Sequence, residues 1–318
     1  MDLKIFSGEA NEPFARNVVG CIASHKLGPM HFHKFSDGEF KIRFEESIRG
    51  QEELFIIQST NPPMENFFEL LLMIDAAKRA SVHRMYIVIP YLVGMRQDKK
   101  EKSREPLTAR LVADLIDCAA GKVPYHVITA DMHSEQQEGY FESITPLQAM
   151  PVAVNYFKEH LSLDNLAIAA PDTNATKRAR EVAERLGCPL IIIDKRRPRE
   201  NESEVVEVIG DPSGKVVLFW DDMLDTAGTI EGGVKAVFER GAIDSYAFCT
   251  HGVLSGPAIE RIRKSSIKKV FVTDTIYQDP RKLAAAGKGK IEIISLAPLF
   301  ADAVMRIYRD QSVSELFE

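Results

Sequence analysis

Short apolar runs alternate with helix-type patterns along almost the whole chain, and this alternation limits the fold more than any other feature. The apolar runs have the length of buried strands, and the segments between them repeat apolar residues with helical spacing. Chains of strand–helix units form mostly parallel sheets with helices on both faces, so an α/β fold is predicted. The expected strands include 54–58, 85–90, 125–130, 166–170, 190–194, 216–221, 245–250 and 269–273.

The alternation is interrupted at TPLQAMP, where a proline stands on each side of a short linker. A chain of 318 residues is long enough for two domains. We therefore predict two similar, doubly wound parallel-sheet domains, 1–148 and 149–318. Within the first, HFHKF and FKIRFEE alternate like the strands of a hairpin.

Composition excludes several kinds of partner. The net charge is -6, so no nucleic-acid partner is expected. No apolar run approaches the ~18 residues of a membrane span, and the start MDLKIFSGEA is unlike a signal peptide. We therefore expect a cytoplasmic protein with no membrane partner. Four scattered cysteines are expected to be small buried residues in a reducing compartment: Cys21, Cys118, Cys188 and Cys249.

The strongest functional signal is VVLFWDDMLDTAGTI, residues 216–230. An apolar strand ends at two adjacent acids, Asp221 and Asp222, and a turn of hydroxyl and small residues leads into a helix pattern. Such a turn can wrap a phosphate because helix N-termini favour anions, and the acids suit sugar hydroxyls or hydrated Mg²⁺. An ordinary acidic turn is the alternative, but the combination favours a site for a phosphorylated sugar.

Two other segments allow both a structural and a functional interpretation. The tetrapeptide SDGE at 36–39 is typical of a hairpin turn, but its carboxylates could also hydrogen-bond a nucleobase or ribose. Residues 94–106 hold a run of cations, which is usually a solvated surface. Because the run follows a buried-type strand, the sharper hypothesis is a mobile basic lid over a polyphosphate.

Three further candidates also follow expected strands. His133, in ADMH, is either structural or linked to a metal or phosphate. Asp172 opens PDTNATKR and either caps the next helix or faces a ligand, while Asn174 beside it can adopt a left-handed backbone. Lys195 and Arg197 belong to DKRRP, directly after LIIID, where buried cations are costly unless an anion faces them.

In sequence order, these motifs resemble the class I ribose-phosphate pyrophosphokinases, also called phosphoribosyl diphosphate synthetases. The resemblance covers nearly the whole chain and rests on FSDGEF, RQDKKEKSREPLTARLVADL, ADMHSEQQEGYF, IDKRRP, DDMLDTAGTI and THGVLSGPAIERI. It implies transfer of the diphosphoryl group of MgATP to the anomeric hydroxyl of ribose 5-phosphate, giving 5-phosphoribosyl 1-diphosphate and AMP. It also implies domains of the type I phosphoribosyltransferase-like fold, the first binding nucleotide and the second ribose 5-phosphate.

The resemblance implies a role for each matching residue. The implied ATP-binding residues are Asp37, Gly38, Glu39, Arg96 and Gln97. The implied ribose 5-phosphate-binding residues are Asp221, Asp222, Asp225, Thr226, Ala227, Gly228 and Thr229. Lys195 and Arg197 match the catalytic cations, and His133 and Asp172 match metal-linked positions. The implied allosteric residues are Ser47, Arg49, Ser81, Ser312, Ser314 and Phe317.

The resemblance further implies a homo-oligomer, a hexamer built from dimers, with the tail 310–318 at a subunit interface. Mg²⁺ would accompany ATP, phosphate would activate and ADP would inhibit. In one departure, Thr173-Asn174-Ala175 stands where the family usually has two glycines, which would let backbone approach a phosphate. This departure motivates one alternative, a non-catalytic regulatory partner of a synthetase. A type I phosphoribosyltransferase is a second alternative, which chain length and the lid disfavour.

Overall fold

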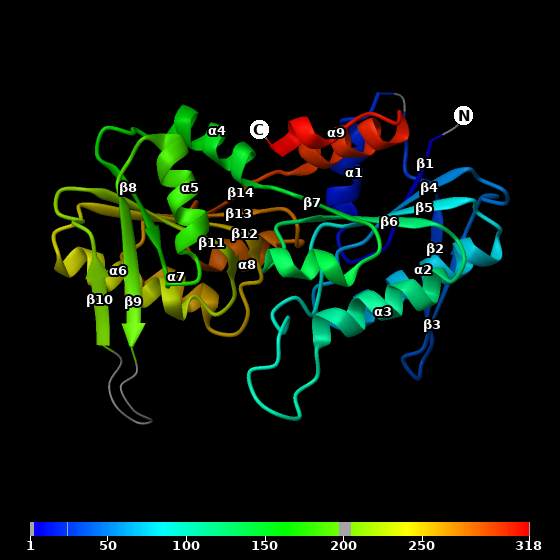
Figure 1. The fold of residues 1–318 in the computed structure, drawn as a ribbon, viewed down its shortest axis with the longest axis horizontal. Coiled ribbons are helices and arrows are strands. Elements are labelled where there is room, and N and C mark those ends of the chain that lie inside the picture. Colours follow the sequence, from blue (N-terminus) through cyan, green and yellow to red (C-terminus); the bar gives the residue numbers. More distant parts are fainter. Residues whose placement is uncertain (1–2, 24, 197–204, 318) are drawn as a thin grey trace. The chain divides into compact units, whose positions relative to one another are not determined.

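The chain forms two compact units in a computed structural model that describes residues 3–23, 25–196 and 205–317 (Figure 1). The first unit comprises Met1–Gln148, Thr275–Tyr277 and Leu296–Glu318, and the second comprises Ala149–Asp274 and Gln278–Ser295. Each unit is built around its own largely parallel sheet, which confirms the predicted α/β class.

The sheet of the first unit is parallel throughout, in the order β1-β4-β5-β6-β7. Its strands are β1 (Lys4–Ser7), β4 (Glu53–Ile57), β5 (Arg84–Ile89), β6 (Tyr125–Ala130) and β7 (Ile144–Leu147). The central strands β4, β5 and β6 are mostly buried, as expected for a parallel sheet with both faces covered. A separate antiparallel hairpin consists of β2 (Met30–Lys34) and β3 (Phe40–Phe44), as the alternating pattern predicted.

Helices cover both faces of this sheet (Figure 1). α2 (Glu65–Arg79) and α3 (Thr108–Ala120) pack together on one face, and α1 (Glu12–Gly20) packs with α9 (Ala297–Tyr308) on the other. Phe14 of α1 and Phe300 of α9 are both buried, with ring centroids 5.2 Å apart in an edge-to-face contact.

The position of α9 differs from the predicted division of the chain. The sequence prediction assigned all of 149–318 to a second domain, whereas Leu296–Glu318 belongs to the first unit. The physical reason is the apolar face of α1, whose buried Phe14 needs a partner helix, and α9 supplies it through Phe300.

The seven-stranded sheet of the second unit has the order β10-β9-β8-β11-β12-β13-β14. Neighbouring strands are parallel except β9 and β10, which form an antiparallel edge. The strands are β8 (Leu166–Ala170), β9 (Leu190–Arg196), β10 (Val205–Ile209), β11 (Val216–Leu224), β12 (Asp244–Gly252), β13 (Lys269–Thr273) and β14 (Ile291–Ile294). The direction of winding changes between β8 and β11, which is where open α/β sheets bind ligands, outside the carboxyl ends of the strands.

Alternate residues of β11 build the two faces of this core. Phe219 faces α6 (Gly228–Glu239), in a cluster that also includes residues of α7 (Ala258–Lys264) and against which Leu283 of α8 (Pro280–Ala285) packs. Trp220 points to the other face, which α4 (Met150–His160) and α5 (Thr176–Leu186) cover. There it lies 4.3 Å from the ring of Phe248 and 6.0 Å from Phe157, measured between centroids.

Several local expectations need correction. The helix expected over 12–26 ends at Gly20, since glycine is a poor helix former. Four short elements lacked enough length for a periodic signal: η1 (Glu135–Tyr140), β7, α8 and η2 (Ser314–Phe317). The expectation of buried cysteines is wrong for Cys21 and Cys118, which are exposed, although Cys249 is buried. Among the residues described, none of the helices has the length and apolarity to span a membrane.

Candidate functional site

The carboxyl end of β11 extends past the end of its neighbour β8. β8 ends at Ala170, and the last paired residues are Phe219 and Ala169. Asp221 therefore lies beyond β8 and pairs with β12 alone, opposite Cys249. The two predicted acids thus lie at the edge of the sheet where the direction of winding changes, the position that favours a ligand site.

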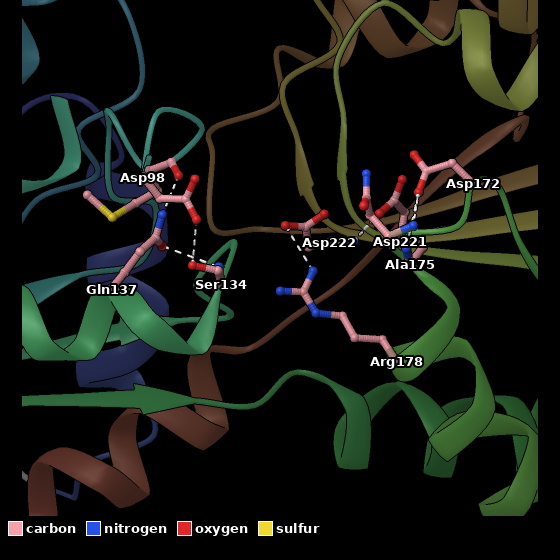
Figure 2. Close-up of polar contacts among 10 residues, drawn as sticks. Asp98, Ser134, Gln137, Asp172, Ala175, Arg178, Asp221 and Asp222 are labelled. Carbon is pink, nitrogen blue, oxygen red and sulfur yellow. Dashed lines mark hydrogen bonds and ion pairs between the residues drawn. The ribbon is translucent and has the colours of Figure 1, made fainter. Parts of the chain in front are cut away.

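Asp222 forms an ion pair with an arginine from the first turn of α5 (Figure 2). Oδ2 of Asp222 lies 2.9 Å from Nη1 of Arg178. Only 6% of the Asp222 side chain is exposed, compared with 34% for Arg178. Asp222 is two residues from Trp220 on a regular strand, so it points to the same face, the one that α5 covers. The sequence prediction missed this partner because the contact joins a helix to a strand far away in the chain.

Asp221 points to the opposite face and is half-buried. Its Oδ1 accepts a hydrogen bond of 2.9 Å from the backbone N–H of Asp222. Burial, and after it the charge of Asp222, raise the pKa of Asp221 to about 8. A carboxyl with a strongly raised pKa at a ligand-binding edge favours a functional over a packing role.

Asp172 organises the loop between β8 and α5 (Figure 2). Its Oδ1 accepts hydrogen bonds from the backbone N–H groups of Asn174, at 2.8 Å, and Ala175, at 3.1 Å. Its Oδ2 makes no hydrogen bond to any residue that the structure describes. The expectation of a left-handed Asn174 is wrong, because the two amide bonds to Asp172 hold the turn without positive φ there.

The turn between β11 and α6 is held by the segment that follows β12. Ser255 donates from its backbone N–H to the Asp225 carbonyl at 3.0 Å and from its hydroxyl to the Asp225 carboxylate. Arg261 of α7 donates from Nη1 to the carbonyl oxygen of Thr226 at 3.0 Å. Neither Ser255 nor Arg261 was predicted as a site residue, although both lie in the motif THGVLSGPAIERI. That motif was the one signal that could have identified them.

Ala227, directly before α6, has a left-handed backbone with φ +60°. This conformation costs an alanine roughly 1–2 kcal/mol, so the surrounding contacts impose the turn. A methyl group on Gly228 would lie 3.0 Å from Nη1 of Arg261, so glycine keeps this space open. Thr226 and Thr229 are exposed on either side. The first N–H groups of α6 therefore lie at a turn of the kind that binds phosphate.

In the first unit, Gln97 anchors the basic segment to the start of α3. Its side-chain oxygen accepts a hydrogen bond from the Thr108 hydroxyl, and its carbonyl accepts one from Ala109 N–H at 3.2 Å. Arg96, one residue earlier, is exposed. The predicted lid therefore begins from a fixed point, with an exposed cation at its root.

The segment containing His133 is also bonded to this root (Figure 2). The hydroxyl of Ser134 donates to Asp98 Oδ2 at 2.7 Å. The hydroxyl of Tyr140 donates to the Asp98 carbonyl at 2.6 Å. Buried Gln137 donates from Nε2 to the carbonyl of Met95. His133 itself is exposed. The structure thus brings together two motifs that are separated in the sequence.

The hairpin turn at 36–39 has the geometry that its sequence predicted. Gly38 adopts φ +97° and donates to the Phe35 carbonyl at 3.0 Å. The N–H of Glu39 bonds to Asp37 Oδ1 at 3.0 Å. Both acidic side chains are exposed. Hydrogen bonds within the turn therefore hold it, and its carboxylates are accessible to a ligand.

The structure describes the predicted cations only in part, and it does not place the two predicted metal-linked residues in one unit. The backbone of Lys195 pairs with Val206 near the end of β9, and Arg197 lies outside the described residues. His133 and Asp172 belong to different units. Within the described part of the chain, no cluster of three or more His, Cys, Asp or Glu side chains has the spacing to hold a metal ion.

The predicted allosteric residues all belong to the first unit. The loop with Ser47 and Arg49 meets the turn with Ser81 through a hydrogen bond from Gly50 N–H to the Ala80 carbonyl at 3.3 Å. Ser81 has φ +59°. In the tail, the hydroxyls of Ser312 and Ser314 lie 3.1 Å apart, and Phe317 ends η2. The structure therefore brings two of the predicted segments together.

Comparison with known proteins gives consistent findings for both units. The family model for the N-terminal domain of ribose phosphate pyrophosphokinase matches residues 3–121, and that for the phosphoribosyl synthetase-associated domain matches 198–318. Ribose-phosphate pyrophosphokinases of Fusobacterium nucleatum and Caldanaerobacter subterraneus are 44% and 46% identical, over 99% of this chain and 98% of each relative. The crystal structure of phosphoribosylpyrophosphate synthetase from Mycobacterium smegmatis matches with a TM-score of 0.89 at 34% identity, over 98% of this chain and 100% of that one.

Proposed function

This chain belongs to the ribose-phosphate pyrophosphokinase family, and on this basis we propose that it transfers the diphosphoryl group of ATP to the anomeric hydroxyl of ribose 5-phosphate. The products are 5-phosphoribosyl 1-diphosphate and AMP, which makes the chain a transferase of nucleotide biosynthesis. The observation that carries the proposal is the group of acids beside a phosphate-type turn at the carboxyl end of β11.

We assign the sugar phosphate to this part of the second unit. The 5-phosphate would lie on the turn Asp225–Thr229, where the N-terminus of α6 and the exposed hydroxyls of Thr226 and Thr229 supply donors. Asp221 would face the ribose, while Asp222, paired with Arg178 on the other face of β11, would hold the strand end beside it. Because burial raises the pKa of Asp221 to about 8, hydroxyl groups that donate to its carboxylate are favourable partners.

We assign ATP to the first unit, to the root of the basic segment and the hairpin turn 36–39. Arg96 and Gln97 lie at the root of the basic segment, so they would hold phosphate oxygens when the segment closes as a lid. Asp37, Gly38 and Glu39 would bind adenine, in the family manner through a neighbouring subunit. Closure would also exclude water, which would otherwise hydrolyse ATP.

The chemical step is an attack of the anomeric hydroxyl on the β-phosphorus, with AMP as the leaving group. In phosphoryl-type transfer the protein mainly positions the reactants and neutralises charge. Lys195 and Arg197 are proposed as the cations that hold the spreading negative charge. The backbone of Lys195 lies near the end of β9, which is the neighbour of β8 in the sheet.

A Mg²⁺ ion is proposed to enter with ATP. Mg²⁺ prefers oxygen ligands, and Oδ2 of Asp172 makes no hydrogen bond to the described residues. On the family resemblance, Asp172 and His133 are proposed as metal-linked, the carboxylate as the better ligand. When bound, Mg²⁺ would neutralise charge on the ATP phosphates.

Regulation and assembly are proposed on the same family basis. A hexamer built from dimers, activated by phosphate and inhibited by ADP, would use Ser47, Arg49, Ser81, Ser312, Ser314 and Phe317. The contact between the loops of Arg49 and Ser81 supports a shared site. Light scattering tests the assembly, and a fully active monomer would contradict it. The cytoplasmic location stays a prediction from composition.

A second candidate function is a non-catalytic partner that restrains a true synthetase. Its supporting observation is the loop Thr173-Asn174-Ala175, whose amides bind Asp172 instead of leaving a glycine-lined approach for phosphate. The preserved basic segment and the 225–229 turn favour catalysis instead. Similarity to a ribose-phosphate pyrophosphokinase over 99% of this chain disfavours a type I phosphoribosyltransferase.

One assay separates these functions. The purified full chain is incubated with Mg²⁺, ATP and ribose 5-phosphate, and nucleotides are separated by chromatography. A synthetase produces AMP only when both substrates are present. A regulatory partner produces none and changes the rate of an added active synthetase. A phosphoribosyltransferase instead consumes 5-phosphoribosyl 1-diphosphate when a nucleobase is supplied.

A further inference from the structure

We propose that Arg178 is a positioning residue for sugar binding, which acts through Asp222 and not through contact with the substrate. Its ion pair fixes the buried carboxylate of Asp222, and the fixed strand end in turn presents Asp221 to the ribose hydroxyls. The inference rests on the proposed function and names a residue role that the motif comparison did not supply.

The geometry supports a mechanical link between the three residues (Figure 2). Nη1 of Arg178 lies 2.9 Å from Oδ2 of Asp222, whose side chain is only 6% exposed. The next contact is the hydrogen bond of 2.9 Å from Asp222 N–H to Asp221 Oδ1. A displacement of Asp222 would therefore reach Asp221 through one residue of backbone and one hydrogen bond.

The position of Arg178 in its helix is not explained by helix stability. It lies in the first turn of α5, where the helix dipole disfavours a cation, and no acidic residue occupies that turn. The ion pair with buried Asp222 on β11 explains an arginine at this position. Without Arg178, Asp222 would lose this ion-pair partner at a buried position, which is unfavourable. It would then be protonated or turn toward water, and both changes disturb the neighbouring acid.

The competing role is direct contact with an anionic group of a substrate, because 34% of the Arg178 side chain is exposed. A double-mutant cycle separates the two roles. If Arg178 acts only through Asp222, its substitution has little further effect once Asp222 is changed to Asn. If Arg178 binds substrate directly, the two substitutions have additive effects.

The variants are Arg178→Met, Arg178→Lys, Asp222→Asn and the double variant Arg178→Met/Asp222→Asn. Arg180→Met is the matched control, since Arg180 is an exposed arginine of the same helix. Calorimetry measures binding of ribose 5-phosphate to the full chain, steady-state kinetics give KM and kcat for each substrate, and thermal unfolding checks folding. If Arg178→Met does not fold, Arg178→Lys against Arg180→Lys makes the same comparison.

We expect Arg178→Met to weaken ribose 5-phosphate binding by about 10- to 100-fold, the effect of losing one bond to a buried charge. KM for ATP should change by less than ~2-fold, and Arg178→Lys should restore part of the affinity. In the Asp222→Asn background, Arg178→Met should change the affinity for ribose 5-phosphate by less than ~2-fold. Additive effects, or an Arg178→Met variant that binds like Arg180→Met, would overturn the proposal. If the parent chain binds the sugar but makes no AMP, the proposed function fails while this binding test still stands.

Discussion

Asp221 should lower the free energy of unfolding as the pH rises, because burial makes ionisation of its carboxyl unfavourable in the folded chain. In the folded chain its pKa is raised from the ordinary value of 3.8 to about 8, first by burial and then by the charge of Asp222. In the unfolded chain the carboxyl loses its proton near the ordinary value. Between these two pH values the folded state holds a proton that the unfolded state has lost, so stability falls as pH rises and levels off above about 8. Asp221→Asn removes this penalty.

The size of the effect follows from the two pKa values. Each unit of difference corresponds to about 1.36 kcal/mol, so the interval from 3.8 to about 8 sets an upper bound of about 6 kcal/mol. Water reaches part of the half-buried side chain and screens its charge, so we expect about 2–4 kcal/mol. Asp221→Asn should exceed the parent chain in unfolding free energy by this amount at about pH 8.5, and by much less at about pH 4.5.

The assay is urea unfolding of the parent and Asp221→Asn across this pH range, with EDTA present and phosphate absent. Asp164→Asn is the control, because Asp164 is an exposed carboxylate of the same unit. The unfolding free energy of Asp164→Asn should stay within about 0.5 kcal/mol of the parent value at every pH. Calorimetry on the same samples should show that Asp221→Asn loses affinity for ribose 5-phosphate. A stability difference that does not depend on pH would refute the reasoning.

Three other substitutions give independent expectations. Burial raises the pKa of Glu69 to about 7, so the parent should lose about 2–3 kcal/mol relative to Glu69→Gln as pH rises from about 4.5 to about 8 in urea unfolding; parallel pH curves would contradict this. Lys195→Ala should lower kcat by about 10²–10³, the typical loss of one electrostatic stabiliser; near-full turnover in steady-state kinetics would exclude Lys195 from the chemistry. Phe157→Ala should lower the unfolding free energy by about 3–5 kcal/mol, because Phe157 is buried against Trp220 and Phe248; a loss below about 1 kcal/mol would contradict the packing described.

The parts of the fold that depend on local patterns were predictable. The apolar run of β11 and the following acids place Asp221 and Asp222 at a strand end, because strand length and polarity are properties of neighbouring residues. The hairpin at 36–39 was predictable for the same reason, since its glycine and acids belong to one turn.

The parts that depend on distant contacts were not predictable. The pairing of Arg178 with Asp222 joins α5 to β11, and the packing of Phe14 on Phe300 joins opposite ends of the chain. Neither contact has a periodic signal in the sequence. The left-handed Ala227 also escaped prediction, because alanine prefers right-handed backbone and only its surroundings impose the turn.

The central claim is that the turn 225–229 and the adjoining acids of β11 hold the sugar phosphate. Amide hydrogen exchange followed by mass spectrometry, with and without saturating ribose 5-phosphate, tests this on the full chain. We predict slower exchange in peptides that cover 222–231, with no change in peptides that cover the hairpin turn 35–39. Unchanged exchange in 222–231 while calorimetry shows bound sugar phosphate would contradict the account.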